Sequence, residues 1–339
     1  MKKIITLFLL LILCLSPVIG QQDAQYFYNQ GNKKFIQSDY QGALSSFNKA
    51  IELDSSMYYA FVSRAEVQTE LGMYDAAMED YEKYRTTIQS LNLLEDPAVI
   101  RQMEDLQKIK EDGGSFFSDQ NVSSYETYEG VNENSESNAS FNVNYSGRWE
   151  NALDYNPEDL RALFLKGNYM YQNGNYNQAL KTFNKAILLD RSIHNLFNAR
   201  GYVKLKLNDL YGALDDFNSA LSLEKNEYFS LVGRGEVKSK LRDYNASIED
   251  YSRAIQINAN QYPAYYGRAI SWFKQKNFAK AIDDFSQTIQ IKPNHAKAFF
   301  NRGLARYNVE DTKAACVDWQ QSNSLGHSKA YDYIRSYCK

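Results

Sequence analysis

The amino-acid sequence predicts an all-α fold in which pairs of antiparallel helices stack into a solenoid. The main observation is a 34-residue period of small residues, each followed at a fixed offset by a large aromatic residue. The small residues are Gly167, Gly201, Gly235, Ala269 and Gly303, and the aromatic residues are Phe183, Phe217, Tyr251, Phe285 and Trp319. A fixed period of this length is the signature of a stacked repeat. Only 5 residues are proline, which suits a chain built from helices.

Each repeat is predicted to contain two helices joined by a short turn. In residues 160–193, Leu163, Gly167 and Tyr171 recur at helical spacing and form one apolar stripe. The turn signal Asn173-Gly174-Asn175 ends this stripe, and a second apolar stripe follows it. The second stripe consists of Tyr176, Ala179, Leu180, Phe183, Ala186 and Ile187. Neither helix buries its apolar face alone, so we expect neighbouring repeats to stack.

These periodic positions resemble the tetratricopeptide repeat family, whose pattern places aromatic, glycine and alanine residues at fixed offsets over 34 residues. The unit at 262–295 shows the pattern as Tyr265, Ala269, Trp272, Ala281, Phe285 and Pro293. Matching units run over 24–57 and 58–91 at the front, and over 160–329 as five consecutive units. The resemblance implies a right-handed α-solenoid with a concave groove lined by the first helix of each unit.

The first twenty residues are predicted to be a secretory signal peptide. Lys2 and Lys3 precede an apolar core over 4–15, and Pro17 ends that core before Gln21. An apolar core of this length is too short to span a bilayer comfortably, although an uncleaved anchor is the alternative. Lipoprotein anchoring at Cys14 is a further alternative, but Leu13 is large for the residue before a lipidated cysteine. We therefore expect an exported chain, periplasmic or extracellular.

The chain between the two groups of repeats departs from the pattern. The spacing from Ala65 to Gly167 is three repeat periods, so residues 92–159 are interpreted as the place of two eroded repeats. A helix is predicted to start at Asp96-Pro97 and to end near Lys110. Residues 115–147 are rich in Ser, Asn and Glu and carry few aliphatic side chains, so we expect them to be mostly disordered.

The predicted organisation follows from these boundaries. It consists of a signal peptide over 1–20, two repeats over 21–91, a helix with a disordered segment over 92–147, a partial repeat and five repeats over 148–326, and a capping helix over 327–339. The capping helix would cover the exposed end of the solenoid core. Once the leader is removed, the remaining cysteines are Cys316 and Cys338, and an exported chain usually pairs an even number of cysteines. Two reduced, buried thiols are the alternative.

Charged residues also follow the period. Basic residues precede the small position at Arg64, Lys166, Arg200, Arg234, Arg268 and Arg302. Acidic residues precede the second-helix aromatic at Asp80, Asp216, Asp250, Asp284 and Asp318. We interpret the two rows as a ladder of ion pairs between packed helices. The alternative is a basic spine for an acidic ligand, which the matching acids argue against.

The sequence contains no pattern typical of catalysis, metal binding or cofactor binding. The three histidines, His194, His295 and His327, are isolated at repeat junctions, where surface or capping roles are common. The glycines follow the repeat period and form no phosphate-binding loop. The net charge of −3 and the absence of a basic stripe disfavour nucleic acid as a partner. No catalytic residue, metal ligand or cofactor site is therefore predicted.

Instead, the resemblance implies a peptide-binding groove on the first helices of the repeats. The groove residues expected from it are Phe164, Asn168, Tyr171, Asn198, Tyr202, Tyr266, Phe273, Phe300 and Tyr307. Aromatic side chains with a few amides suit an extended peptide or a partner helix, although several of these positions could belong to the core. The hypothesis is a non-catalytic protein–protein interaction scaffold. The alternative is an accessory component of an envelope assembly that acts through residues 115–147.

Overall fold

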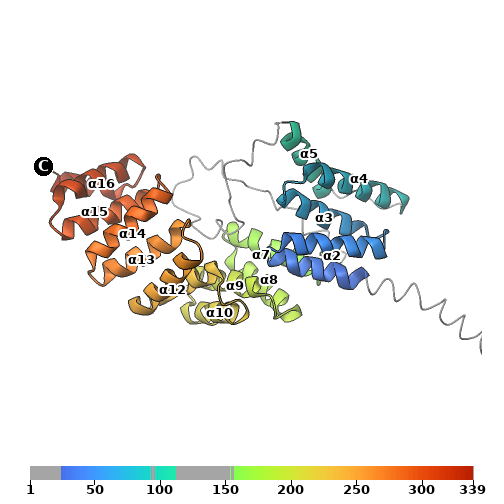
Figure 1. The fold of residues 1–339 in the computed structure, drawn as a ribbon, viewed down its shortest axis with the longest axis horizontal. Helices are drawn as coiled ribbons and strands as arrows, with labels where there is room; N and C mark the ends of the chain where they lie inside the picture. The colour runs from blue at the N-terminus through green and yellow to red at the C-terminus, as the bar shows by residue number, and fades with distance from the viewer. Residues whose placement is uncertain are drawn as a thin grey trace, which may run out of the picture. The chain divides into compact units, whose positions relative to one another are not determined.

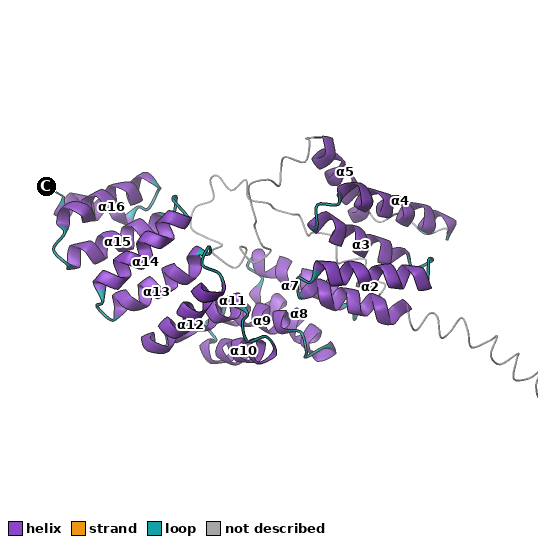
Figure 2. Cartoon of the chain, viewed as in Figure 1, coloured by secondary structure: helices purple, strands orange, loops and turns teal. Residues whose placement is uncertain are grey.

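The computed structural model describes residues 24–91, 93, 95, 97–111, 153 and 156–338. The predicted signal peptide over 1–20 and the predicted disordered segment over 115–147 lie outside these residues. The chain divides into two compact units, Met1–Leu196 and Phe197–Lys339. In the described ranges all regular secondary structure is α-helical, as the period predicts (Figure 1, Figure 2).

The helices follow the predicted pairs. A first helix over 24–36 is followed by α2 (Tyr40–Leu53), α3 (Tyr58–Glu70), α4 (Tyr74–Ser90), α5 (Pro97–Glu111), α7 (Leu160–Gln172), α8 (Tyr176–Leu189) and α9 (His194–Lys206). The remaining helices are α10 (Leu210–Leu223), α11 (Tyr228–Lys240), α12 (Tyr244–Ile257), α13 (Tyr262–Lys274), α14 (Phe278–Ile291), α15 (Ala296–Asn308), α16 (Thr312–Ser324) and α17 (Lys329–Tyr337). From α2 to α5 and from α10 to α17, each helix packs against the next. This consecutive packing is that of a repeat solenoid.

A residue in the left-handed conformation makes the turn inside each repeat. At this position φ is +72° at Gly72 and +75° at Gly174, but +61° at Asn208 and +62° at Lys276, where the Cβ atom makes this backbone conformation less favourable than it is for glycine. In some repeats the next residue also caps the second helix: the Asp209 carboxylate, for example, accepts a hydrogen bond from the Gly212 backbone N–H at 3.0 Å. Met73 and Asn175, at the same position, make no side-chain cap. The turn therefore starts each second helix at a fixed point of the period, with or without a side-chain cap.

The periodic aromatic residues fill the space left by the periodic small residues. Phe217 is fully buried on α10. A Cβ atom built on Gly201 would lie 2.9 Å from the Phe217 ring, and one built on Gly233 in the next repeat would lie 2.4 Å from it. Any larger residue at these glycines would collide with the ring. The same close approach recurs between Gly167 and Phe183, at 2.6 Å from such a Cβ. The sequence period is therefore a packing period.

The charged rows form the predicted ladder of ion pairs. Arg234 donates to both carboxylate oxygens of Asp250, at 2.6 and 2.8 Å, and to Asn218 Oδ1 on the preceding second helix at 2.9 Å. Lys238 also pairs with Asp250, at 2.7 Å. Equivalent pairs join Arg64 to Asp80, Arg200 to Asp216, Arg268 to Asp284 and Arg302 to Asp318. Arg64, Arg268 and Arg302, like Arg234, also donate to a polar side chain of the preceding second helix, so each of these four arginines ties three consecutive helices together.

The front repeats contact the repeat at 160–193. The predicted place of two eroded repeats, residues 92–159, lies largely outside the described residues. Asn32 of the first helix donates a hydrogen bond to Asp159, immediately before α7, at 3.2 Å. Lys33 of the same helix pairs with Asp190 at the end of α8, at 3.3 Å. The front repeats therefore contact the later repeat directly, inside the first unit.

The last helix closes the stack. Ala330, Tyr333 and Ile334 of α17 pack with Trp319 of α16 in one apolar cluster. Cys316 and Cys338 form a disulfide that joins α16 to the residue after α17. No helix among the described residues combines the length and the apolar character that a bilayer crossing requires.

Candidate partner-binding groove

The predicted groove residues all lie on the first helix of a repeat, but the structure does not leave them equally accessible. Asn198, Tyr202, Tyr171 and Phe300 are buried. The Tyr202 hydroxyl donates to the Phe229 carbonyl at 2.8 Å, and its ring lies 5.1 Å from that of Phe217. Phe300 stacks on His327 at 4.5 Å. Tyr202 and Phe300 thus hold neighbouring repeats together, and all four buried side chains offer little surface to a partner.

On α7, Phe164 and Asn168 are both half-buried. The Phe164 ring lies edge-on to Phe183 of the same repeat at 6.3 Å, so it also contributes to packing. These two residues belong to the first unit, whereas the remaining predicted residues lie on α13 and α15 of the second unit. The predicted set is therefore divided between the two units.

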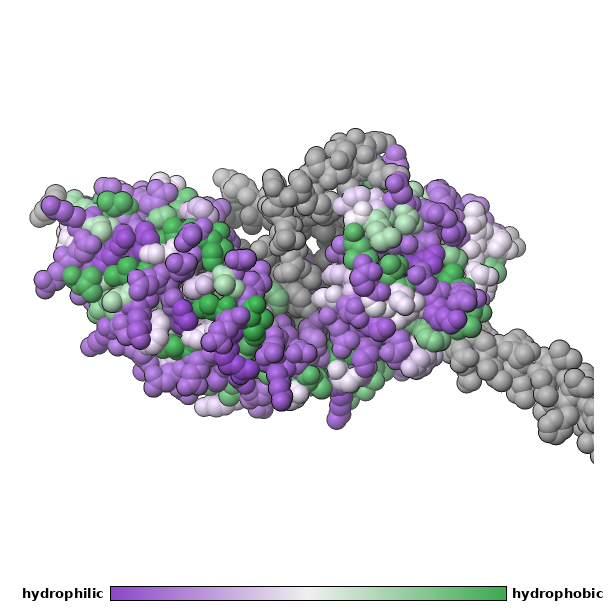
Figure 3. Space-filling view, in the orientation of Figure 1, coloured by the Kyte–Doolittle hydropathy of each residue, from purple (hydrophilic) through white to green (hydrophobic). Residues whose placement is uncertain are grey.

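Partly exposed aromatic residues gather on α13 and α15. We call this set the α13–α15 surface, and it consists of Tyr266, Ile270 and Phe273 on α13 with Asn301, Leu304 and Tyr307 on α15. The Asn301 amide donates to the Tyr266 hydroxyl at 3.0 Å, which joins the two helices. Tyr307 is 38% exposed and contacts Tyr337 at 4.8 Å. Figure 3 shows small groups of hydrophobic residues between hydrophilic ones over these helices.

Two polar side chains that the groove prediction omitted lie on this surface or contact it, namely Asn301 and His295. Asn301 follows the predicted Phe300 in sequence, and only the helix geometry shows which of the two faces Tyr266. His295 lies 4.7 Å from the Tyr266 ring, and its Nδ1 accepts the Ala298 backbone N–H at 3.0 Å. His295 is thus a helix cap, one of the roles expected for a junction histidine. Burial, assisted by the charge of Lys292, lowers its pKa to about 4, so the imidazole is neutral at pH 7.

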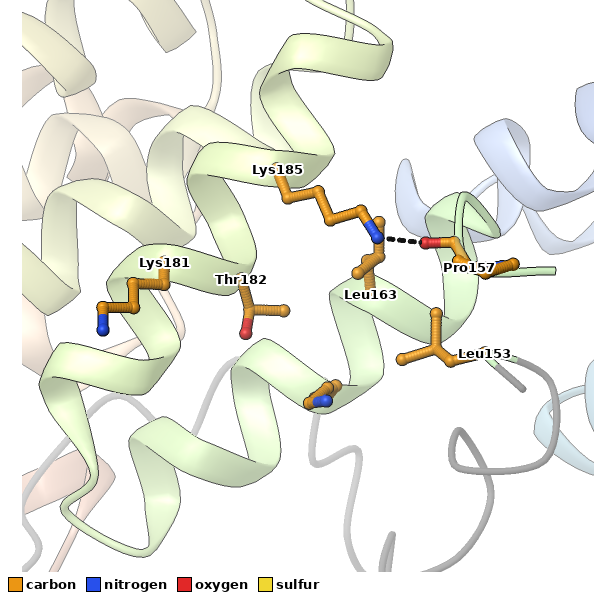
Figure 4. A pocket seen from close by; sticks show the side chains of 7 residues that line it. Leu153, Pro157, Leu163, Lys181, Thr182 and Lys185 are labelled. Atoms are coloured by element: carbon orange, nitrogen blue, oxygen red, sulfur yellow. Dashed lines mark hydrogen bonds between the residues drawn. The ribbon is translucent and has the colours of Figure 1, made fainter.

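A second feature is a pocket of about 300 Å³ beside α7 and α8. Figure 4 shows Lys181, Thr182 and Lys185 of α8 opposite Leu163 and Leu153. The Lys185 ammonium donates to the Pro157 carbonyl at 2.5 Å. That ammonium is therefore used to hold the segment before α7. Among the described residues, no group of three His, Cys, Asp or Glu side chains is placed to hold a metal ion.

Comparison with protein families agrees with this geometry. Family models described as tetratricopeptide repeat match residues 28–90, 160–193, 230–261 and 262–295. The chain belongs to the tetratricopeptide repeat family. Its repeats form an α-solenoid of the kind that serves as a scaffold for protein–protein interaction. No curated protein sequence matches the chain significantly.

The solved structures that the chain resembles include YrrB, MamA and a protein from Parabacteroides merdae. YrrB, a tetratricopeptide repeat protein with an unusual peptide-binding site, is 22% identical over 55% of this chain and 97% of its own, with a TM-score of 0.45. MamA is 20% identical over 49% of this chain and 96% of its own, with a TM-score of 0.43. A tetratricopeptide repeat protein from Parabacteroides merdae is 13% identical over 94% of this chain and 100% of its own, with a TM-score of 0.46.

Proposed function

We propose that this chain is a non-catalytic scaffold that binds a peptide or a partner protein along the α13–α15 surface. The observation that carries the proposal is the gathering of Tyr266, Phe273 and Tyr307, all partly exposed, on two adjacent first helices. Aromatic side chains supply large contact area at low entropic cost, and their hydroxyl groups supply hydrogen bonds. An extended peptide or an amphipathic helix suits such a surface.

The arrangement of the polar side chains supports the absence of catalysis. The acids on the second helices, such as Asp284 and Asp318, accept hydrogen bonds from ladder arginines. His295 caps α15, and His327 stacks on Phe300. These candidate acids and bases are already used for folding. The absence of a basic stripe supports a protein or peptide, rather than nucleic acid, as the partner.

Export of the chain is part of the same proposal. Two observations support export. One is the apolar leader sequence over 1–20, and the other is the Cys316–Cys338 disulfide, because disulfides persist in oxidising compartments. The check is thiol alkylation of cells expressing the tagged chain, followed by mass spectrometry of peptides containing Cys316 and Cys338. We expect both cysteines to be protected until a reductant is added. Free thiols in the native cell would contradict export to an oxidising compartment.

The binding surface is tested with a matched pair of variants. Phe273→Ala combined with Tyr307→Ala removes two aromatic side chains from the α13–α15 surface. Tyr211→Ala, on the second helix α10 where Tyr211 is 72% exposed, is the control. Affinity purification of the tagged chain should recover the partner with the control and lose most of it with the double variant. Equal recovery with both variants would place the binding site elsewhere.

A further inference from the structure

The groove positions of the front repeats are filled by another part of the chain. Tyr28, Asn32 and Phe35 stand four repeat periods before Phe164, Asn168 and Tyr171, so they occupy the equivalent groove positions of the repeat at 24–57. Glu66 takes the Asn32 position in the repeat at 58–91. All four of these front residues contact the segment that begins α7. A surface that in other repeats would face a partner here faces residues 159–165.

The first contact is made with an acid. Asp159 is 4% exposed and caps α7, because its Oδ1 accepts the Ala162 backbone N–H at 2.8 Å. Its Oδ2 accepts the Tyr28 hydroxyl at 3.0 Å and the Asn32 amide at 3.2 Å. One carboxylate oxygen thus caps α7, and the other accepts hydrogen bonds from the groove residues. Burial raises the pKa of Asp159, and these hydrogen bonds counter that effect.

The second contact is made by the positively charged side chain of Arg161. Arg161 is 3% exposed, and its guanidinium contacts the Glu66 carboxylate and lies 5.9 Å from the Phe35 ring. Glu66 is held in turn by Gln102 of α5, whose amide donates to it at 3.3 Å. Gln102 accepts the Tyr81 hydroxyl at 3.1 Å. The acid that receives Arg161 is therefore positioned by α4 and α5.

The third contact is apolar. Ala162 and Leu165 of α7, which follow Arg161 in the chain, form a cluster with Phe35. An isolated buried carboxylate or guanidinium is costly, so burial of both on one helix end requires a complementary receptor. The front groove provides that complement, with donors for Asp159, an acid for Arg161 and an aromatic ring for the apolar turn.

We propose that the groove of the repeats at 24–91 is a recognition site for a helix N-terminus with Asp at the cap and Arg two residues later, and that residues 159–165 occupy it as an internal ligand. This assignment is independent of the α13–α15 surface. The front groove is closed to other partners while α7 remains in place. A segment with the same Asp-x-Arg chemistry would bind there only after α7 leaves.

The test uses the full chain and a labelled synthetic peptide of residues 156–172. Asp159→Ala with Arg161→Ala weakens the internal ligand, and fluorescence anisotropy then measures binding of the peptide in trans. We expect this double variant to bind the peptide at least about tenfold more tightly than the wild-type chain does. Adding Tyr28→Phe and Glu66→Gln to the double variant should reduce that binding by about tenfold or more. The peptide bearing the two alanines is the ligand control, and Glu158→Gln, an exposed neighbour of Asp159, is the chain control.

Two results would overturn the proposal. One is a folded double variant that binds no peptide, and the other is equal binding of the native and the alanine-substituted peptides. If the double variant does not fold, the peptide assay is replaced by amide hydrogen exchange, measured on chains in which the charges at Glu66 and Arg161 are reversed. Glu66→Arg alone should then expose the first turn of α7, and Glu66→Arg with Arg161→Glu should restore its protection. Loss of protection in the exchanged pair as large as in the single variant would also contradict the assignment.

Discussion

The hydroxyl of Tyr28 donates a hydrogen bond to the buried carboxylate of Asp159 at 3.0 Å, across 131 residues of sequence. Tyr28 stands at a groove position of the first repeat, and Asp159 caps the helix that starts the second group of repeats. The order of repeats in the sequence is therefore not the order of contacts in the first unit. The groove positions of the front repeats contact residues 159–165 of the same chain. The α13–α15 surface of the second unit remains partly exposed.

The packing of Phe217 against Gly201 and Gly233 predicts a large effect of truncation. Phe217→Ala should lower the free energy of unfolding of the chain by about 3–5 kcal/mol, because it empties a fully buried aromatic site. Urea denaturation followed by circular dichroism measures the change. Tyr211→Ala on the same helix is the exposed control and should stay within about 0.5 kcal/mol of wild type. A loss below about 1 kcal/mol for Phe217→Ala would mean that this helix face is not core.

The ladder of ion pairs predicts that replacing one of its acids alone lowers the stability of the fold. Asp250 is buried between Arg234 and Lys238, so Asp250→Asn leaves two cations facing each other without their counter-charge. We expect a loss of about 3 kcal/mol in the free energy of unfolding, at the lower end for a buried pair because the cations are partly exposed. Glu249→Gln removes the adjacent, exposed acid and should have little effect. Equal stability of the two variants in chemical denaturation would refute a structural role for the ladder.

The disulfide predicts a local effect at the end of the stack. Cys316→Ser with Cys338→Ser opens a loop with a sequence separation of 22 and should cost about 3 kcal/mol in the chain-entropy model. The loss should appear first as faster amide exchange in α17, which the bridge ties to α16. Adding a reductant to the wild-type chain should reproduce it. Unchanged exchange in α17 after reduction would show that Tyr333 and Ile334 hold this helix without the bridge.

His295 predicts a pH dependence with a defined sign. Its pKa is about 4 in the folded chain and 6.5 when unperturbed, so the unfolded chain binds the proton first as the pH falls. The contribution to stability is complete above pH 6.5 and is lost between pH 6.5 and 4. It amounts to about 2–3 kcal/mol, given a shift of this size and the partial exposure of the ring.

The matched variant for this prediction is His295→Asn, because asparagine can cap α15 without titrating in this range. Urea denaturation of both chains at pH 7 and pH 4.5 should show the larger loss of stability in the wild-type chain. Parallel losses in the two chains would mean that His295 is as easily protonated in the folded chain as in the unfolded one.

The sequence predicts those features that repeat. Gly201 and Phe217 fix helix packing through one local fit. Arg234 and Asp250 face each other because the same spacing separates an arginine from an aspartate in five of the seven units. Contacts that occur only once in the chain cannot be predicted from the repeat period. Nothing periodic connects Tyr28 to Asp159, so the register alone did not predict their direct contact. The accessibility of the groove residues also depends on single contacts, as in Tyr202, whose hydroxyl is held by the Phe229 carbonyl and whose side chain is buried.

Site-specific photo-crosslinking in living cells tests the central claim most directly. A photoreactive phenylalanine analogue replaces Tyr307 on the α13–α15 surface in one strain and Tyr211 on α10 in another. Mass spectrometry then identifies the adducts of the tagged chain. A scaffold that binds through the α13–α15 surface should give one dominant protein adduct at position 307 and none at 211. Absence of any protein adduct at 307, or the same adducts at both positions, would contradict that account.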